Sequence, residues 1–422
     1  MTCRKLLAAA SAAFLTVSLG LVANTSAADK YEVIYNFPGL AGGSGPAGLI
    51  SDAAGNLYGT ASGGPDSLYG DKGVVFKLSH NASGKWSESV LHTFQGKDGT
   101  GPSGGLVIDK DGNVYGTTSL GGGYNSGLVF KLAPELDGKW SETVLHSFQG
   151  TDGVNPNGDL VFDKAGNLYG TTNAGGGHNL GLVFKLAPEL DGKWSETVLH
   201  SFQGTDGANP NGGLIFDRAG NLYGTTYSGG THNNGTVFKL SPDADGEWTE
   251  TVLHSFQGSP DGANPDAGLI FDRVGNLYGP TYGGGTPNFG GYGTVFKLSP
   301  ELNGEWTETV LHSFQAADNL QAPGGFYPEA RLTFDRAGNL YGTTFFGGSG
   351  GAAGVVFKLS PELNGRWIET VMRSFQGYPD GGEPMGTLII DSAGHLYGTT
   401  TVGGNSGNCF IAGCGTVFQI TP

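Results

Sequence analysis

The chain contains 422 residues, of which 78 are glycine and only 14% are charged. Its formal net charge of −16 argues against nucleic acid and against an anionic membrane surface, because both partners require clustered Lys and Arg. Glycine shows no strict three-residue period, which excludes collagen, and recurrent apolar runs exclude a disordered chain. Many short β-prone runs among so many glycines predict a turn-dense, all-β protein.

Residues 1–28 have the pattern of a signal peptide. Arg4 and Lys5 precede a long apolar run, and small residues follow it up to a cleavage point near Ala27 or Ala28. A membrane anchor is the alternative interpretation of the same run. Once the signal is removed, we expect no membrane span, and we expect the mature protein to be secreted, periplasmic or at the cell surface.

From residue 31 onward, one unit repeats seven times. Each unit, as in residues 213–256, holds four short runs rich in β-branched and aromatic residues, separated by turn residues. Four strands per unit, with successive units 54 to 63 residues apart, predict the blades of a β-propeller. A β-solenoid, whose coils are usually shorter, is the alternative. Copies or close variants of the string GNLYGTT begin at Gly55, Gly112, Gly166, Gly220, Gly275, Gly338 and Gly394.

The two ends of the chain complete the ring. Residues 31–37, YEVIYNF, match the fourth run of a unit, whereas the chain finishes with the first three runs, GTLIID, HLYGTT and GTVFQI. Pairing the N-terminal strand with the three C-terminal strands makes a seventh blade and removes two free sheet edges. We therefore predict that residues 31–422 form a seven-bladed β-propeller with four strands per blade and 1+3 closure.

Only two cysteines, Cys409 and Cys414, remain in the mature chain, because Cys3 lies in the signal segment. In an exported protein this pair predicts one disulfide that closes a small loop in the last blade. A metal site would need two further ligands close by, and the sequence offers none. We therefore expect neither a metal nor another cofactor.

The strings GNLYGTT, GTVFKL and ETVLHSFQG together resemble the GloVer tandem-repeat family, the bacterial choice-of-anchor proteins, over roughly residues 31–422. The resemblance implies export and display at the cell surface, without an established activity. Members of that family often end in an anchoring segment, whereas this chain stops at ITP after its last predicted strand. The anchoring part of the resemblance therefore does not carry over to the residues present.

Residues that recur in every unit are expected to serve the scaffold, because a single chemical site occurs only once. On this argument the repeated tryptophans and histidines pack between blades, and neither a sugar platform at each tryptophan nor a shared metal at the histidines is favoured. The Asp–Gly turns have two interpretations, ordinary turn chemistry or an acidic ring that attracts cations. DKDGN at 109–113 imitates the start of a calcium loop, but later acidic ligands are missing, which favours a hairpin turn. The residues concerned are Trp86, Trp140, Trp194, Trp248, Trp306 and Trp367; His92, His146, His200, His254 and His312; and Asp98, Asp152, Asp206, Asp261 and Asp380.

The variable loops join the second and third strands of each unit, on the same face as the connections between blades. Exposed aromatic rings on these uncharged loops suit stacking against sugars or peptides. Shielding of the blade tops is the alternative interpretation. The loops carry Tyr69, Tyr124, Tyr227, Tyr282, Phe289, Phe345 and Phe346.

The repeat is also broken where the first, channel-lining strand starts. Most units have glycine there, but the third has Asp159 and the sixth has Arg331, which follows an insertion that carries Glu329. The seventh unit contributes Glu383. We predict that these four residues rim one mouth of the central channel, where carboxylates near an arginine suit a polar ligand or acid–base chemistry. Ordinary rim charges are the alternative.

Two classes of function follow. The first is a monomeric, non-enzymatic binding module that holds a polysaccharide, a peptide or a surface protein through its variable loops. The second is an extracytoplasmic polysaccharide hydrolase or lyase with a site at the channel mouth. The sequence contains no G-x-S-x-G, H-E-x-x-H, P-loop or C-x-x-C pattern, which favours the first class. The ligand, any catalytic residue and calcium binding by the Asp–Gly turns stay open at this stage.

Overall fold

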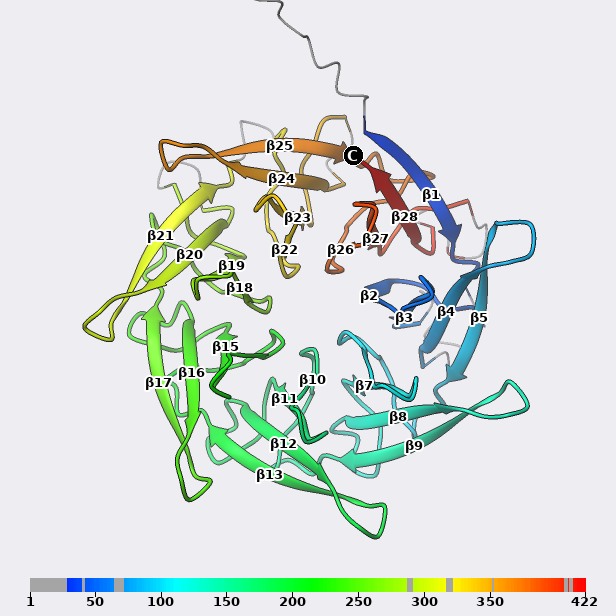
Figure 1. The fold of residues 1–422 in the computed structure, drawn as a ribbon, viewed down its shortest axis with the longest axis horizontal. Helices are drawn as coiled ribbons and strands as arrows, with labels where there is room; N and C mark the ends of the chain where they lie inside the picture. Colours follow the sequence, from blue (N-terminus) through cyan, green and yellow to red (C-terminus); the bar gives the residue numbers. More distant parts are fainter. Residues whose placement is uncertain are drawn as a thin grey trace, which may run out of the picture.

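The computed structural model describes residues 29–39, 42–63, 72–286, 291–315, 322–350, 353–405, 409 and 413–422. Within these residues the strands form seven four-stranded antiparallel sheets, arranged as a ring around a central channel (Figure 1). This part of the chain contains no α-helix, and hence none long and apolar enough to cross a membrane. The prediction of an all-β, seven-bladed propeller is confirmed. The predicted signal peptide, residues 1–28, lies outside the described residues.

Within each blade the first strand lies nearest the channel and the fourth lies at the outer edge. The first strands are β2 (Pro46–Ser51), β6 (Val107–Ile108), β10 (Val161–Phe162), β14 (Ile215–Phe216), β18 (Ile270–Phe271), β22 (Thr333–Phe334) and β26 (Ile389–Ile390). The second strands are β3 (Leu57–Ala61), β7 (Val114–Thr118), β11 (Leu168–Thr172), β15 (Leu222–Thr226), β19 (Leu277–Thr281), β23 (Leu340–Thr344) and β27 (Leu396–Thr400).

The outer half of each blade is a longer hairpin. The third strands are β4 (Val74–His80), β8 (Leu128–Pro134), β12 (Leu182–Pro188), β16 (Thr236–Pro242), β20 (Thr294–Pro300), β24 (Val355–Pro361) and β28 (Thr416–Thr421). The fourth strands are β5 (Trp86–Thr93), β9 (Trp140–Ser147), β13 (Trp194–Ser201), β17 (Trp248–Ser255), β21 (Trp306–Ser313), β25 (Trp367–Ser374) and, in the seventh blade, β1 (Lys30–Asn36). We number the blades in chain order from the one that contains β2.

Most first strands are two residues long, shorter than the β-prone run GLIFD at residues 213–217. Strand β14, for example, pairs with β15 over two residues only. The chain ahead of it lies against the next blade instead: a Cβ at Gly212 would stand 2.7 Å from the carbonyl carbon of Ala267. The hydroxyl of Thr225 donates a hydrogen bond across the same boundary to the Ala267 carbonyl, at 3.0 Å. The crowding of the blades around the channel therefore limits pairing within each sheet.

The string GNLYGTT forms a turn end and the second strand of a blade, as the fourth blade illustrates. Asn221 Nδ2 and the Tyr223 hydroxyl both donate to Asp217 Oδ2, at 2.6 and 3.1 Å, which fixes the turn between β14 and β15. Gly224 leaves room for the ring of Phe238 in β16, because a Cβ there would lie 2.6 Å from the ring's Cζ. The Asn, the Tyr and the second Gly of GNLYGTT thus have packing or hydrogen-bonding roles inside their own blade.

The core of the molecule lies between consecutive blades. One of its clusters joins Tyr169 and Val183 of blade 3 to Phe202, Leu214 and Phe238 around blade 4. All six tryptophans stand 6.1 to 6.4 Å, centroid to centroid, from the tyrosine ring of the preceding blade's second strand. This geometry agrees with the packing interpretation of the repeated aromatic residues.

Four of the five repeated histidines pair with the Asp–Gly turns, whereas His312 Nε2 lies 3.8 Å from Glu369 Oε2. His200 Nε2 lies 2.9 Å from Asp206 Oδ2, and Asp206 Oδ1 accepts the backbone N–H of Gln203. The same arrangement recurs at His92, His146 and His254. These aspartates are therefore engaged by their own turn and by a histidine, as the turn interpretation expects.

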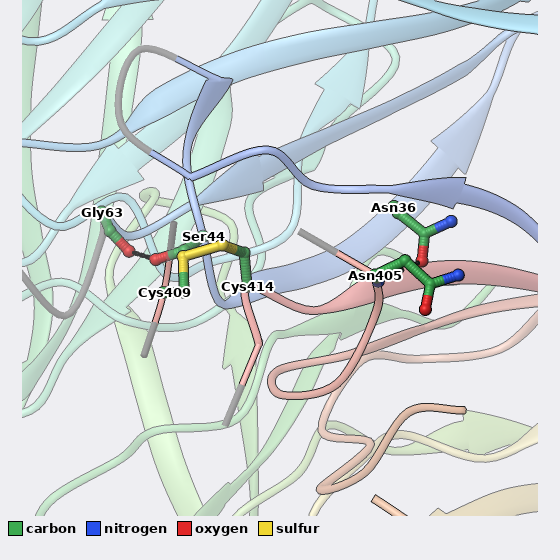
Figure 2. Close-up of a disulfide and its surroundings, with 6 residues drawn as sticks. All are labelled: Asn36, Ser44, Gly63, Asn405, Cys409 and Cys414. Atoms are coloured by element: carbon green, nitrogen blue, oxygen red, sulfur yellow. Dashed lines mark hydrogen bonds between the residues drawn. A yellow bond between two sulfur atoms is a disulfide. The ribbon is translucent and has the colours of Figure 1, made fainter. Parts of the chain in front are cut away.

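The predicted disulfide between Cys409 and Cys414 is present, in the loop between β27 and β28 of the seventh blade (Figure 2). Both cysteines are buried in the same cluster as Phe37, which directly follows β1. In the same loop the backbone N–H of Asn405 donates to Asn36 Oδ1 at 3.1 Å. The disulfide therefore braces the blade in which the two ends of the chain meet.

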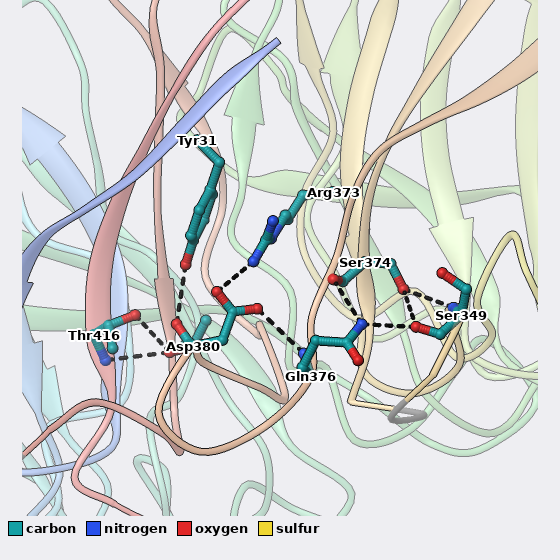
Figure 3. A network of polar contacts seen from close by, with 8 residues as sticks. Tyr31, Ser349, Arg373, Ser374, Gln376, Asp380 and Thr416 are labelled. Atoms are coloured by element: carbon teal, nitrogen blue, oxygen red, sulfur yellow. Dashed lines mark hydrogen bonds and ion pairs between the residues drawn. The ribbon is translucent and has the colours of Figure 1, made fainter. Parts of the chain in front are cut away.

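The seventh blade closes the ring. Strand β1 pairs antiparallel with β28, from Lys30 opposite Thr421 to Asn36 opposite Thr416, which confirms the 1+3 closure. At the boundary with blade 6, Arg373 and Asp380 replace the usual His–Asp pair, and the Arg373 guanidinium lies 4.0 Å from the centroid of the Tyr31 ring (Figure 3). The closing strand is thus held by side chains from the blade before it.

Candidate functional site

The connections between blades and the loops between second and third strands share one face, which we call the loop face. Each connection contains a residue with a left-handed backbone, followed by a proline and then a third residue. Glycine and asparagine adopt this backbone at little cost, but Tyr327 and Glu383, in blades 6 and 7, do not. Backbone outliers of this kind are concentrated at functional sites, which directs attention to blades 6 and 7. The left-handed residues are Gly45, Gly101, Asn155, Asn209, Asn264, Tyr327 and Glu383, with φ between 54 and 62°.

The residue that follows the proline in each connection differs in polarity and charge around the ring. Along blades 3 to 5 a chain of hydrogen bonds runs from Asn173 Nδ2 to Asn211 Oδ1 at 2.6 Å, and from Asn211 Nδ2 to Asp266 Oδ1 at 2.7 Å. In blade 6 the equivalent position holds Glu329. In ring order the third residues are Ala47, Ser103, Asn157, Asn211, Asp266, Glu329 and Met385.

Three carboxylates form an acidic cluster on this part of the loop face: Asp266, Glu329 and Glu383. Burial, together with the charges of Asp266 and Glu383, raises the pKa of Glu329 to about 7. Burial also raises the pKa of Asp266, although the hydrogen bond from Asn211 opposes that rise. Since like charges in a partly buried site cannot all ionise freely, Glu329 holds its proton in a large share of molecules at neutral pH.

Three tyrosines lie beside the acidic cluster and form what we call the aromatic shelf: Tyr227, Tyr282 and Tyr327. The rings of Tyr282 and Tyr327 are stacked, with centroids 4.3 Å apart and an angle of 7° between their planes. Burial raises the pKa of Tyr227 and of Tyr282, and the charges of Asp266 and Glu329 raise both further. Tyr227 and Tyr282 are therefore within electrostatic reach of these two carboxylates.

A separate ion pair crosses the channel from blade 3 to blade 6. Arg331 Nη2 lies 3.7 Å from Asp159 Oδ2, and Asp159 Oδ1 accepts the backbone N–H of Gly105 at 2.6 Å. Glycine at the matching place in blade 4 makes room for this pair, because a Cβ at Gly213 would stand 2.7 Å from Asp159 Cβ. The pair borders a channel cavity of about 470 Å³ lined mainly by β2, β6, β10 and β14.

The four predicted rim charges thus fall into two groups. Asp159 and Arg331 meet each other, whereas Glu329 and Glu383 belong to the acidic cluster. Among the described residues, no ion pair joins Arg331 to either glutamate. The sequence argument placed all four on one rim and did not anticipate this division.

The aromatic residues predicted on the variable loops do not all lie together. Tyr227 and Tyr282 stand on the shelf, while Phe345 and Phe346 pack against each other, with centroids 4.4 Å apart. Tyr124 lies far round the ring in blade 2 and is 64% exposed. Tyr69 and Phe289 lie outside the described residues.

Asp266 and Tyr327 were missed by the sequence argument. Their signal was present, however: each replaces an asparagine or a smaller residue that most other connections carry around the same proline. An alignment of the seven connections alone would have found them. Within the described residues, no group of three or more His, Cys, Asp or Glu side chains is arranged to hold a metal ion.

Several solved structures are similar to this chain at low sequence identity. The extracellular domain of a putative one component system from B. thetaiotaomicron matches 92% of this chain with 12% identity and a TM-score of 0.54, and this chain spans only 39% of that one. A protein of unknown function from Dyadobacter fermentans has 12% identity over 93% of this chain and 97% of its own, with a TM-score of 0.44. A putative oxidoreductase (glucose dehydrogenase) from Thermus thermophilus has 15% identity over 93% of this chain and 100% of its own, with a TM-score of 0.43.

At the level of sequence, no curated protein matches the chain. The Gloeobacter/Verrucomicrobia repeat, in contrast, matches residues 16–195, 136–333 and 291–422, which together cover the propeller. The chain belongs to the Gloeobacter/Verrucomicrobia repeat family.

Proposed function

We propose that this protein is an extracytoplasmic, non-catalytic binding module that holds a neutral glycan on the aromatic shelf of its loop face. The observation that carries the proposal is the parallel stack of Tyr282 and Tyr327 near the carboxylates of Asp266 and Glu329. Aromatic faces offer apolar area to the C–H faces of a sugar ring, and neighbouring carboxyl oxygens accept hydrogen bonds from its hydroxyls.

The position of these residues supports a binding role. They come from blades 4 to 6, so a rigid scaffold sets their spacing, while the connections that carry them vary between blades. Tyr227, Tyr282, Tyr327 and Glu329 are all partly exposed, so their polar tips and ring faces remain accessible. The strained backbone at Tyr327 fits a residue kept for a ligand and not for packing alone.

The extracytoplasmic location rests on chemistry that the chain itself carries. A buried disulfide in a chain with no other cysteine after residue 28 is typical of an oxidising compartment. The signal-peptide pattern of residues 1–28 agrees with export.

Titration calorimetry with a panel of neutral oligosaccharides tests the proposal. Replacing Tyr282 or Tyr327 with alanine should weaken binding about tenfold, since each loses a stacking surface. Tyr124→Ala is the matched control, because it removes an exposed tyrosine of the same face in blade 2, far from the shelf. Equal affinities for all three variants, or no binding of any glycan by the unmodified protein, would contradict the proposal.

One observation favours a second candidate, a polysaccharide hydrolase or lyase. Glu329, whose pKa is raised to about 7 by burial and by the charges of Asp266 and Glu383, has the protonation behaviour of a general acid. Incubation with a bound polysaccharide, followed by assays for new reducing or unsaturated ends, separates the two candidates. Product formation that disappears in Glu329→Gln would establish catalysis, whereas binding without product leaves the binding module.

A further inference from the structure

The mouth of the channel opposite the loop face is built from the turns between first and second strands. Each turn begins with an aspartate, and in five consecutive blades the next residue is basic. Blades 1 and 7 have the neutral residues Ala53 and Ser392 instead. The basic residues, all exposed, are Lys110, Lys164, Arg218, Arg273 and Arg336. In a chain with only 22 Lys and Arg in total, five of them therefore stand along one arc of this mouth.

The carboxylate of each turn's aspartate accepts hydrogen bonds from donors of the same turn. In blade 5, Asp272 Oδ1 accepts the backbone N–H groups of Val274 and Asn276, at 3.0 and 2.9 Å. Its Oδ2 accepts Asn276 Nδ2 at 2.6 Å and the Tyr278 hydroxyl at 3.1 Å. Four donors thus surround one carboxylate, and these hydrogen bonds lower its pKa despite some burial. The neighbouring guanidinium is left free of that carboxylate.

The arginines themselves have no ionic partner. In the described part of the chain, neither Lys164 nor any of Arg218, Arg273 and Arg336 forms an ion pair, whereas Lys110 pairs with Asp111 at 2.8 Å. An unpaired, planar guanidinium offers up to five N–H donors in a geometry that matches a carboxylate. Three such groups around one opening are an unusual concentration of free donors for anions.

A single hollow collects these arginines together with aromatic rings. It has a volume of about 1,100 Å³ and is lined by the turns of blades 4, 5 and 6, including all three arginines and the turn aspartates Asp217, Asp272 and Asp335. Phe216, Phe271 and Phe334 line its inner side. Each of these rings is fixed edge-on by a tyrosine of the preceding blade, at a centroid distance of 5.1 Å. The hollow therefore combines rigid apolar walls with arginine donors, while the aspartate carboxylates beside them are occupied by donors of their own turns.

We propose that this hollow is a second binding site, which takes an acidic oligosaccharide whose uronate carboxylates are held by Arg218, Arg273 and Arg336. The phenylalanine rings then contact the sugar faces between the carboxylates. An oligomer fits better than a single sugar, because the three arginines come from three adjacent blades and the hollow exceeds the size of a usual small-ligand pocket.

The two channel mouths select opposite ligands under this proposal. The acidic cluster of the loop face repels a polyuronate, whereas the unpaired arginines of the opposite mouth can donate hydrogen bonds to its carboxylates. The overall charge of −16 disfavours longer polyanions such as nucleic acid, whose binding needs an extended basic surface. Since the site shares no residue with the aromatic shelf, this proposal can be tested independently of the proposed neutral-glycan binding.

Titration calorimetry of the full chain with oligogalacturonate at low salt tests the proposal. Each single variant, Arg218→Ala, Arg273→Ala or Arg336→Ala, should weaken binding about tenfold, and the triple variant should abolish it. The corresponding Arg→Lys triple should recover part of the affinity, because charge is kept but paired donation is lost. Affinity should also fall as salt is added.

The control removes the same charge from the same face at its outer edge, in the variant Lys85→Ala/Lys193→Ala/Arg366→Ala, whose three residues are exposed. Unchanged binding by this control, with loss in the arginine triple, supports the site. Equal weakening in both variants would show a general charge effect and overturn it. So would absence of oligogalacturonate binding, tighter binding of neutral dextran, or binding of single-stranded DNA in its place.

Discussion

The two mouths of the channel are made by the same seven-fold scaffold, but their carboxylates differ in the number of hydrogen bonds they accept and in the direction of their pKa shifts. On the loop face, Asp266 receives one side-chain hydrogen bond, and burial raises its pKa. At the opposite mouth, Asp272 receives four hydrogen bonds, and its pKa is lowered. The number of donors aimed at a carboxylate therefore decides whether it stabilises the fold or remains available to a ligand.

The difference arises from where the donors come from. The four donors of Asp272 lie within six residues of it in the same turn, so every copy of the turn reproduces them. Asp266 depends on Asn211, 55 residues away in the preceding blade. Because their hydrogen bonds are local, the turns at the mouth opposite the loop face are alike in all blades. On the loop face, the hydrogen bonds run between blades, so the residues there can differ from one blade to the next.

The largest expected effect compares the two aspartates directly. Asp272→Asn should lower the free energy of unfolding by about 2 kcal/mol, because a charged acceptor is lost and an amide N–H₂ then faces other donors. Asp266→Asn should change it by no more than about 0.5 kcal/mol, since the amide oxygen can still accept from Asn211 and a buried charge is removed. Urea unfolding of both variants measures the contrast. Equal losses of unfolding free energy in the two variants would contradict the proposed difference between the two aspartates.

A smaller effect is expected for the arginines of the two mouths. Arg331→Ala leaves Asp159, whose side chain is 29% exposed, without its ionic partner, and should cost about 1 kcal/mol of stability. Arg273→Ala removes an exposed and unpaired charge, so its cost should stay within about 0.5 kcal/mol. A double-mutant cycle with Asp159→Asn would isolate the pair. Additive losses in that cycle would mean that the ion pair contributes nothing.

A third effect concerns pH. Glu329 binds its proton more tightly in the folded chain than in the unfolded one, so it stabilises the fold at acidic pH and loses this contribution as pH rises from about 4.5 to about 7. Asp272, with its lowered pKa, contributes above its ordinary pKa and loses that contribution only in more acidic solution. The melting temperature should therefore fall between about pH 5 and pH 8, and Glu329→Gln should reduce that fall.

The reduction should be partial, because glutamates between the blades act in the same direction. Burial raises the pKa of Glu142, Glu196, Glu250, Glu308 and Glu369 to about 7 as well. His146 and His312, whose pKa values are lowered by burial, act in the opposite direction and gain stability as pH rises. Thermal melts of the variant and the unmodified chain at both pH values check the prediction. A rise in melting temperature toward pH 8 would contradict it.

The sequence by itself determined the parts of the molecule that local interactions build. Seven copies of GNLYGTT predicted seven blades, the matching end strings predicted β1 beside β28, and two nearby cysteines predicted the disulfide. These inferences succeeded because the donors, acceptors and packing partners of each copy lie within one unit or in its immediate neighbour.

Only the tertiary structure decided which unusual residues meet. Asp159 reaches Arg331 because the ring places blades 3 and 6 across one channel, and Glu329 joins Asp266 and Glu383 instead of its near neighbour in sequence. Likewise, three basic residues from separate turns line one hollow only because the ring places their blades side by side. Such contacts depend on the rotation from blade to blade, which is set by packing between sheets and leaves no short-range pattern in the chain.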